Sequence, residues 1–246
     1  MKVEICCGSY QDCLNAYHGG ADRIELNSAL FLGGLTPSIA SLKLAKQEVE
    51  IPIVCMVRPR GAGFNYDESE IKVIFEDAKE LLEAGADGLA FGFLNEDASI
   101  EVELTKKMVE LIHSYGKEAV FHRAYDCVAD ADAAMETLIE CKVDRVLTSG
   151  LKATAIAGGE MIAHLVEKYG DRIEILAGSG VKDHNVVDFV KATKVEQVHS
   201  SAKAWAIDKT TTGQEVTYAY HEPYDYDVVD LDLVKKIVHE IRGMED

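Results

Sequence analysis

The sequence has no apolar run of the roughly 20 residues that a membrane-spanning helix requires. Its first residues, MKVEICC, also lack the long apolar stretch of a signal peptide. These two absences argue against a membrane protein and against export. We therefore expect a cytoplasmic protein.

Basic residues are scarce in this chain. Lys and Arg together number 25, whereas Asp and Glu number 43, and the formal net charge is −18. Such a field repels phosphate backbones and anionic lipid surfaces. We expect neither a nucleic-acid nor a membrane partner, and the sequence leaves open whether the protein is a homo-oligomer.

Paired cysteine motifs and flexible linkers are also missing. Six cysteines occur in 246 residues, without a CxxC pair, so the sequence indicates neither a disulfide framework nor a structural zinc site. Most of these cysteines are expected to be reduced and packed as small apolar side chains. No segment rich in Pro, Ser or charge divides the chain, which predicts one domain over 1–246.

What the sequence does contain is a repeated unit of apolar strand, polar turn and amphipathic helix. Strands are predicted at 3–7, 22–26, 51–57, 87–91, 118–122, 144–148, 173–177 and 196–200. Helices are predicted at 10–18, 38–48, 68–84, 102–115, 130–140, 154–169, 183–192 and 230–242. Eight units predict a (β/α)₈ TIM barrel, with a long loop at 203–229 before the C-terminal helix. An open doubly wound sheet is the structural alternative.

Successive strand residues in a barrel face the lumen and the helix layer alternately. The consistently apolar phase, which includes Val3, Ile5 and Ile24, is assigned to the helix layer. The other phase is polar and contains Glu4, Cys6, Arg23, Glu25, Val54, Met56, Arg58, His122, Glu174, Gln197 and His199. Buried charges are costly unless they are paired, so this lumen predicts a structural ion-pair network, a functional site, or both.

Four of these polar residues stand where their strands end. Glu25, Arg58, His122 and His199 are expected to share one cavity at the C-terminal end of the barrel, where barrel enzymes place their active sites. Glu25 is the better general-base candidate, with His122 as the alternative. Each histidine could equally be a satisfied core residue. No lysine lies on the lumen phase of a strand, which disfavours Schiff-base chemistry.

The segment FHRAYD (121–126) adds Arg123 and Asp126 to this catalytic set. Arg58 and Arg123 are either counter-ions for the carboxylates or a local anion trap, because focusing depends on nearby charge rather than on net charge. Asp126 is either part of the site or a cap for the helix at 130–140.

Small, hydroxyl-rich turns follow the last three strands. Such turns leave backbone N–H groups free to converge on an oxyanion, and barrels often bind phosphate there. Together with an arginine from the loop RPRGAGF, they predict an anion-binding set of Arg60, Ser149, Gly178, Ser179, Gly180, Ser200 and Ser201.

Several motifs resemble those of the CutC family. These are EICCGSYQDCLNAYHGGADRIELNSALFLGGLTPS, RPRGAGFNY, FHRAYD, RVLTSG, LAGSGV and VHSSA, in the same order from Glu4 to about Ala204. The resemblance implies a TIM barrel, a cytoplasmic protein of copper homeostasis, and binding of Cu(I). It also implies that the metal site includes Cys6 and Cys7.

Ligand chemistry gives a somewhat different set for copper. Cu(I) prefers thiolate and thioether ligands, which selects Cys6, Cys7 and Met56. Because Cys6 and Cys7 are adjacent on a strand, they should point to opposite faces, and Cys6 with Met56, joined by His122, is the alternative. A purely structural role for Cys6 and Cys7 is the remaining alternative. Two functions are therefore compatible with the sequence: a copper-binding protein, or a barrel enzyme acting by acid–base chemistry on a small anionic metabolite, phosphorylated or not.

Overall fold

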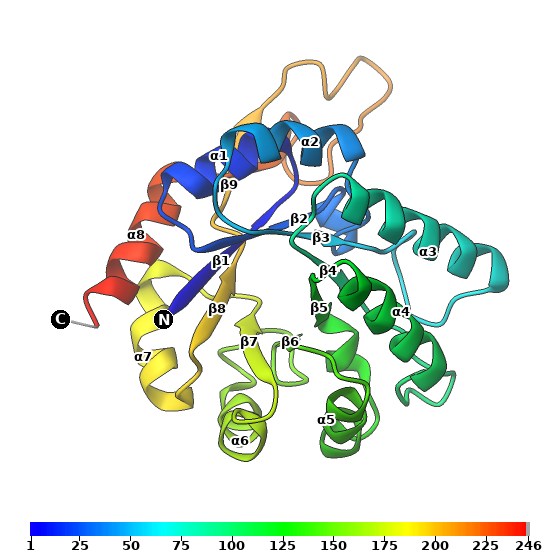
Figure 1. The fold of residues 1–246 in the computed structure, drawn as a ribbon. Helices are drawn as coiled ribbons and strands as arrows, with labels where there is room; N and C mark the ends of the chain where they lie inside the picture. Colours follow the sequence, from blue (N-terminus) through cyan, green and yellow to red (C-terminus); the bar gives the residue numbers. More distant parts are fainter. Residues whose placement is uncertain (245–246) are drawn as a thin grey trace.

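A closed barrel of parallel strands forms the centre of the computed structural model, which describes residues 1–244 (Figure 1). The barrel strands are β1 (Lys2–Cys7), β2 (Arg23–Leu26), β3 (Ile53–Met56), β4 (Gly88–Phe91), β5 (Glu118–Phe121), β6 (Arg145–Thr148), β7 (Glu174–Gly178) and β8 (Gln197–Ser200). They pair in sequence order, and β8 returns to pair with β1. The barrel predicted from the sequence is confirmed, and the open sheet is excluded.

Helices surround the barrel as an outer ring (Figure 1). They are α1 (Tyr10–His18), α2 (Ile39–Glu48), α3 (Glu68–Glu83), α4 (Val102–Ser114), α5 (Ala131–Glu140), α6 (Gly159–Tyr169), α7 (Asp183–Thr193) and α8 (Leu231–Arg242). Several starts are fixed by capping side chains: Ser9, Asp67 and Asp130 each accept a hydrogen bond from a backbone N–H of the first turn. Because Asp130 caps α5, Asp126 is not the cap of that helix.

Helix α6 begins at Gly159 and not at residue 154, where the sequence pattern placed it. In the preceding turn, the Gly158 N–H donates to Thr154 O over 3.0 Å. Gly158 lies directly against the β6 loop, where an added Cβ would come within 2.0 Å of Ser149 O. Residues 154–158 therefore form a turn that meets that loop at Gly158 instead of extending the helix.

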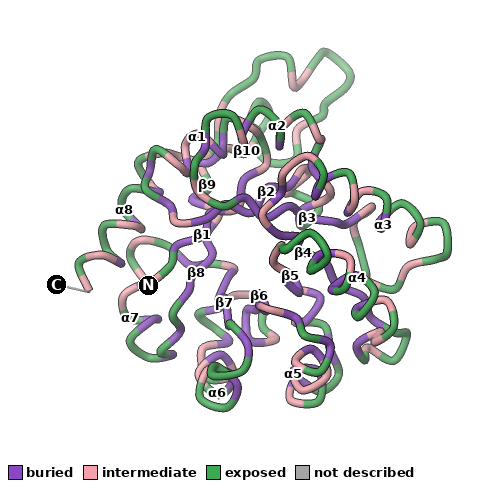
Figure 2. The backbone as a smooth tube through the Cα atoms, in the orientation of Figure 1, coloured by how far each residue is buried: buried purple, intermediate pink, exposed green. Residues whose placement is uncertain are grey.

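The segment 203–229, expected to be a loop, contains two antiparallel strands, β9 (Lys203–Ile207) and β10 (Asp225–Val229). Along KAWAI, exposed and half-buried residues alternate, as in a strand with one covered face. Figure 1 shows the connection between them projecting beyond α1 and α2, and Figure 2 shows that most of this connection is exposed. We call residues 203–229 the hairpin.

The alternation assigned from the sequence is present in the barrel. Val3, Ile5 and Ile24 are fully buried in the large core between the strands and the helices. A separate apolar cluster of Val54, Met56, Ala90 and Val120 lies on the lumen phase. The barrel therefore has two packing layers, and its lumen combines a small apolar cluster with polar residues.

The lower lumen is closed by a buried ion-pair network. Glu4 accepts a hydrogen bond from Arg23 Nε, and Arg145 NH2 lies 3.7 Å from Glu4 Oε2. Arg145 is fully buried and also contacts Glu118 and Glu174. Burial disfavours an ionised Glu4, but Arg23, His199 and Arg145 outweigh this cost and hold the pKa of Glu4 well below its usual range. The pair of Glu4 and Arg23 is thus structural.

Within residues 1–244, no helix combines the length and the apolar character that a bilayer span needs. The cytoplasmic location and the absence of nucleic-acid partners stay predictions from the sequence.

Replacing Glu4 by Gln should destabilise the fold by about 3–5 kcal/mol, because the buried Arg23 guanidinium would lose its only carboxylate among residues 1–244 and Arg145 would lose one of three. Urea denaturation of the variant measures this loss. The matched control is Glu96→Gln, at an exposed position, which should change stability by less than about 0.5 kcal/mol. Equal stabilities of the two variants would contradict the role assigned to Glu4.

Candidate functional site

A cavity of about 490 Å³ opens at the C-terminal ends of the barrel strands. Of the residues predicted for the site, Cys6, Glu25, Met56, Arg58, His122, Arg123, Asp126, Ser179, Gly180, His199 and Ser201 line this cavity. The four residues expected to meet at the mouth are therefore brought together by the fold. A volume of this size is within the range of small-molecule sites.

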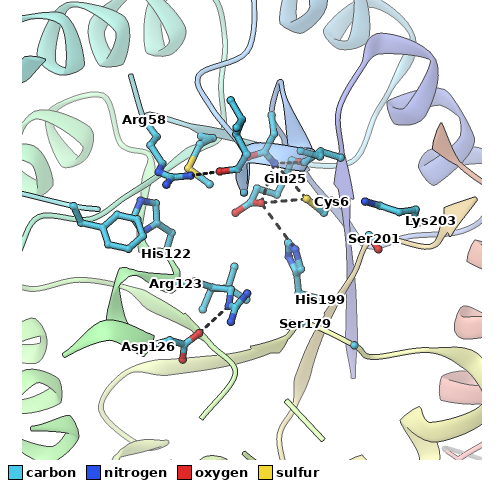
Figure 3. A pocket seen from close by; sticks show the side chains of 18 of the residues that line it. Cys6, Glu25, Arg58, His122, Arg123, Asp126, Ser179, His199, Ser201 and Lys203 are labelled. Carbon is cyan, nitrogen blue, oxygen red and sulfur yellow. Dashed lines mark hydrogen bonds and ion pairs between the residues drawn. The ribbon is translucent and has the colours of Figure 1, made fainter. Parts of the chain in front are cut away.

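One wall of the cavity carries a thiol, a carboxylate and an imidazole that converge (Figure 3). The strand register sets Cys6 beside Glu25, and His199 comes from the neighbouring strand on the other side. Glu25 Oε2 lies 3.6 Å from Cys6 Sγ and 4.0 Å from His199 Nε2. One ligand atom from each residue lies within 4.8 Å of the other two, so this triad could hold a metal ion.

The His199 ring is oriented by Glu4 from below. Its Nδ1 lies 2.7 Å from Glu4 Oε1, so the ring donates this proton to the carboxylate and directs Nε2 toward the cavity. Burial opposes a charged imidazole, but the hydrogen bond to Glu4 and the charge of Glu25 outweigh it and raise the pKa of His199. Histidine ligands of metal ions commonly donate their second ring N–H to a carboxylate in this way.

Cys6 is a protonated thiol in this arrangement. Burial and the neighbouring Glu25 carboxylate raise its pKa well above the ordinary value. Asn27 Nδ2 lies 3.4 Å from Cys6 Sγ and donates a hydrogen bond to Glu25 Oε2 over 2.9 Å. The Asn27 amide thus holds the Glu25 carboxylate beside the thiol. Because thiolate is the ligand form, a metal ion bound here would replace the thiol proton.

Cys7 does not join Cys6, so the metal pair implied by the family resemblance is not assembled. Its Sγ lies 3.6 Å from Ile5 O, and the residue is fully buried in the core between the strands and the helices. The cause is the strand pleat, which turns consecutive side chains to opposite faces. Met56 does line the cavity with Cys6, from the third strand.

His122 lies on the opposite wall as a neutral ring. Its Nδ1 accepts a hydrogen bond from Ala124 N over 3.1 Å, which places the remaining proton on Nε2. Burial and the adjacent charge of Arg58 lower the pKa of His122 to about 3. Its buried Nε2 has no hydrogen-bond partner among the described residues. His122 Nε2 is therefore a hydrogen-bond donor without an acceptor among the described residues. Because this nitrogen carries a proton, His122 is disfavoured as the general base.

Arg58 is a buried guanidinium held by backbone carbonyls. Its NH1 donates to Leu32 O and Gly34 O, each over 3.0 Å, and its NH2 donates to Ala62 O over 2.6 Å. Its Nε is buried without a partner, and none of the ion pairs among residues 1–244 includes Arg58. The group also stacks over the Phe64 ring at 5.0 Å. The loops thus position a cation for which residues 1–244 supply no carboxylate.

Arg123 and Asp126 form a separate structural unit at the edge of the cavity. Asp126 accepts from Arg123 Nε and Ser149 Oγ, each over 2.8 Å, and from Thr148 Oγ1 over 2.6 Å. These contacts tie η2 (Arg123–Cys127) to the loop after β6. Arg123 is therefore already paired with a carboxylate, unlike Arg58.

The expected anion cradle is only partly present. Arg60 turns to Glu70 and to backbone carbonyls, and so it is engaged away from the cavity. Ser149 is used by Asp126, Ser200 Oγ donates to Val181 O, and Gly178 packs its Cα against Leu147 and His199. The composition of the turns was enough to predict the positions of the hydroxyl groups. It could not predict which protein atoms these hydroxyls bond.

Several lining residues were not singled out from the sequence. Asn27, Phe64 and Cys127 line the cavity, and Lys203, noted only as a loop residue, lies at its rim. Asn27 comes two residues after Glu25, so its position at a strand end was a usable signal. Phe64 is an apolar side chain in a glycine-rich loop, and its packing against the Arg58 guanidinium and the His122 ring depends on the loop conformation.

The fold and the cavity define a class: a (β/α)₈-barrel protein with a polar, ligand-sized site at the C-terminal mouth. The particular family follows from the sequence itself. The CutC family model matches residues 1–204, and the chain belongs to this family.

Similar proteins come from distant organisms. A Treponema denticola protein named family protein CutC is 43% identical over 242 residues, which cover 97% of this chain and 98% of the relative. A human protein named copper homeostasis protein cutC homolog is 41% identical over 202 residues, covering 82% of this chain and 73% of the human one.

Solved structures agree with the fold. The CutC protein of Streptococcus agalactiae has a TM-score of 0.76 at 30% identity and covers 82% of this chain and 98% of its own. The phosphoribosyl anthranilate isomerase of Thermococcus kodakaraensis has a TM-score of 0.59 at 17% identity, covering 98% and 99% respectively. The second likeness concerns the fold alone.

We predict that the His122 ring stays neutral, with its proton on Nε2, down to about pH 4. Nitrogen chemical shifts of the imidazole followed by NMR measure this directly. Between pH 6.5 and 3 the unfolded chain binds a proton that the folded chain does not, so this group's stabilising contribution falls as the pH drops. A ring that titrates near pH 6.5 would contradict the assignment.

Proposed function

We propose that the chain binds a metal ion at the mouth of the barrel through Cys6, Glu25 and His199. One observation supports this above the others: the ligand atoms of these three side chains converge within 4.8 Å, and Glu4 orients the histidine. The triad also lies open to the cavity, because all three residues line it.

Copper as Cu(I) is the first candidate for this ion. The human relative is named a copper homeostasis protein, and thiolate and imidazole ligands suit copper. Met56 supplies a thioether in the same cavity. The carboxylate of Glu25 is a harder ligand that suits Zn²⁺ better, so the donor set fits a soft ion only in part. In this proposal the protein holds copper as cargo, and the mouth of the barrel is the route of entry.

A second candidate function is an enzyme that acts on a small anionic metabolite in the same cavity. The specific support is the buried Arg58 guanidinium, which has no carboxylate partner among the described residues. In this reading Arg58 binds the anion, His122 donates a hydrogen bond, and Glu25 serves as the general base. Arg123 and Asp126 act as positioning residues through the β6 loop. The two functions are compatible, because they use opposite walls.

Copper binding predicts a selective effect of cysteine substitutions. Under anaerobic, reducing conditions and competition from a chromogenic Cu(I) chelator, the wild type should bind one equivalent of Cu(I). Cys6→Ser should weaken binding at least about tenfold, because it removes the soft ligand of the triad.

The matched control is Cys141→Ser, a buried cysteine at the end of α5, which should bind Cu(I) like the wild type. Equal losses in the two variants would indicate nonspecific capture by thiols and would contradict the site. Tighter binding of Zn²⁺ than of Cu(I), lost in Cys6→Ser, would keep the metal site and overturn the assignment to copper.

A further inference from the structure

We infer that the anion held by Arg58 and His122 is the carboxylate of a small organic acid. This inference rests on the second proposed function, since it names the class of ligand that the cavity would take. It follows from the donors that the wall leaves free and from those that the protein has already used.

The first step is the missing counter-ion of Arg58. An arginine side chain stays protonated in proteins, and a buried charge is costly without a partner. Arg58 is 5% exposed, and its neighbours are backbone carbonyls, the Phe64 ring and the Tyr66 hydroxyl, none of which carries a negative charge. Arg23 and Arg145, the other deeply buried arginines, lie beside Glu4. Within the described chain, Arg58 is thus the buried guanidinium that an external anion would neutralise.

The second step is a pair of unused donors on the same wall. Arg58 Nε and His122 Nε2 are both buried, and neither has an acceptor among residues 1–244. The Phe64 ring packs against both groups, 5.0 Å from the guanidinium and 5.1 Å from the imidazole. Figure 3 shows the two side chains close together beside the cavity. Two fixed N–H groups match the two oxygens of one carboxylate.

The third step concerns phosphate, which the turn sequences had predicted. A phosphate group presents three strong acceptor oxygens and needs a larger set of donors. Three of the four serine hydroxyls that were expected to supply them are taken: Ser149 bonds Asp126, Ser179 Oγ donates to Ala153 O, and Ser200 Oγ donates to Val181 O. Of the four, only Ser201 lines the cavity without a hydrogen-bond partner among the described residues.

The N-terminus of α7, a usual place for phosphate in this fold, is also occupied. Asn185 Oδ1 accepts from Lys182 N, and Asp183 Oδ1 accepts from His184 N, each over 2.9 Å. The chain's own side chains thus satisfy these donors, and the Asp183 carboxylate repels an anion there. A single serine hydroxyl adds little to the two N–H donors of Arg58 and His122, and this pair therefore favours a carboxylate over a phosphate.

The rest of the ligand would extend toward the opposite wall. Cys6, Glu25 and His199 lie across the cavity from Arg58 and His122 (Figure 3). A ligand anchored by its carboxylate thus presents its remaining polar atoms to the general-base candidate Glu25. A cavity of about 490 Å³ admits an acid of a few carbon atoms with room for water.

Calorimetric titration at low salt with pyruvate, glycolate and inorganic phosphate tests this inference. The wild type should bind at least one of the two carboxylates, and more tightly than it binds phosphate. His122→Asn keeps an acceptor for the Ala124 N–H but removes the Nε2 donor. Arg58→Lys keeps the charge but removes the Nε donor. Each substitution should weaken carboxylate binding about 10- to 100-fold.

The matched controls are His113→Asn and Arg172→Lys, whose side chains pair with Asp144 and Glu136 at the opposite end of the barrel. Both should bind like the wild type, and circular dichroism checks that all four variants are folded. Phosphate binding that exceeds carboxylate binding and is lost in Arg58→Lys would overturn the carboxylate assignment but leave the anion site. Carboxylate affinity unchanged in both site variants, or no anion binding at all, would overturn the inference, and the latter would also remove the second proposed function.

Discussion

The buried carboxylate of Glu4 is the interaction on which the candidate site depends. It lies in the lumen, where it pairs with Arg23 and contacts Arg145 below, and it holds His199 above. A single ionised group thus links the ion-pair network of the lower lumen to the ring that completes the triad with Glu25. Because a buried carboxylate is stable only with such partners, the ion-pair network and the site geometry are consequences of the same burial.

Strand periodicity was enough to predict the barrel and most of the cavity. The two-residue repeat assigns each strand side chain to a face, and parallel strands in order bring their ends together, which is why Glu25, Arg58, His122 and His199 meet. What the sequence could not give is how loop side chains pair. The engagement of Arg60 by Glu70 depends on three-dimensional loop paths that composition does not encode.

The cavity has two chemically different walls, and this division would allow a chain with a net charge of −18 to bind the proposed anion. The triad wall contributes a thiol, an imidazole and a carboxylate. The other wall contributes Arg58, whose charge is shielded from the acidic exterior by Phe64 and by the surrounding loops. Electrostatic focusing in a cleft depends on the nearest charges and on a low local dielectric constant, so the global charge does not decide the local one.

The hairpin supports the rim of this cavity, and most of it lies beyond residue 204, where the matched family region ends. Tyr220 stacks on Phe31 with ring centroids 4.7 Å apart, and Phe31 belongs to η1 (Leu30–Leu32), whose neighbouring leucines line the cavity. Lys203, at the start of the hairpin, lies at the rim and pairs with Asp227. The polar residues of the site come from the barrel, whereas the shape of the rim after β2 depends on an aromatic contact from the hairpin. Changes in the hairpin can therefore alter access to the site while the triad and the Arg58 wall stay the same.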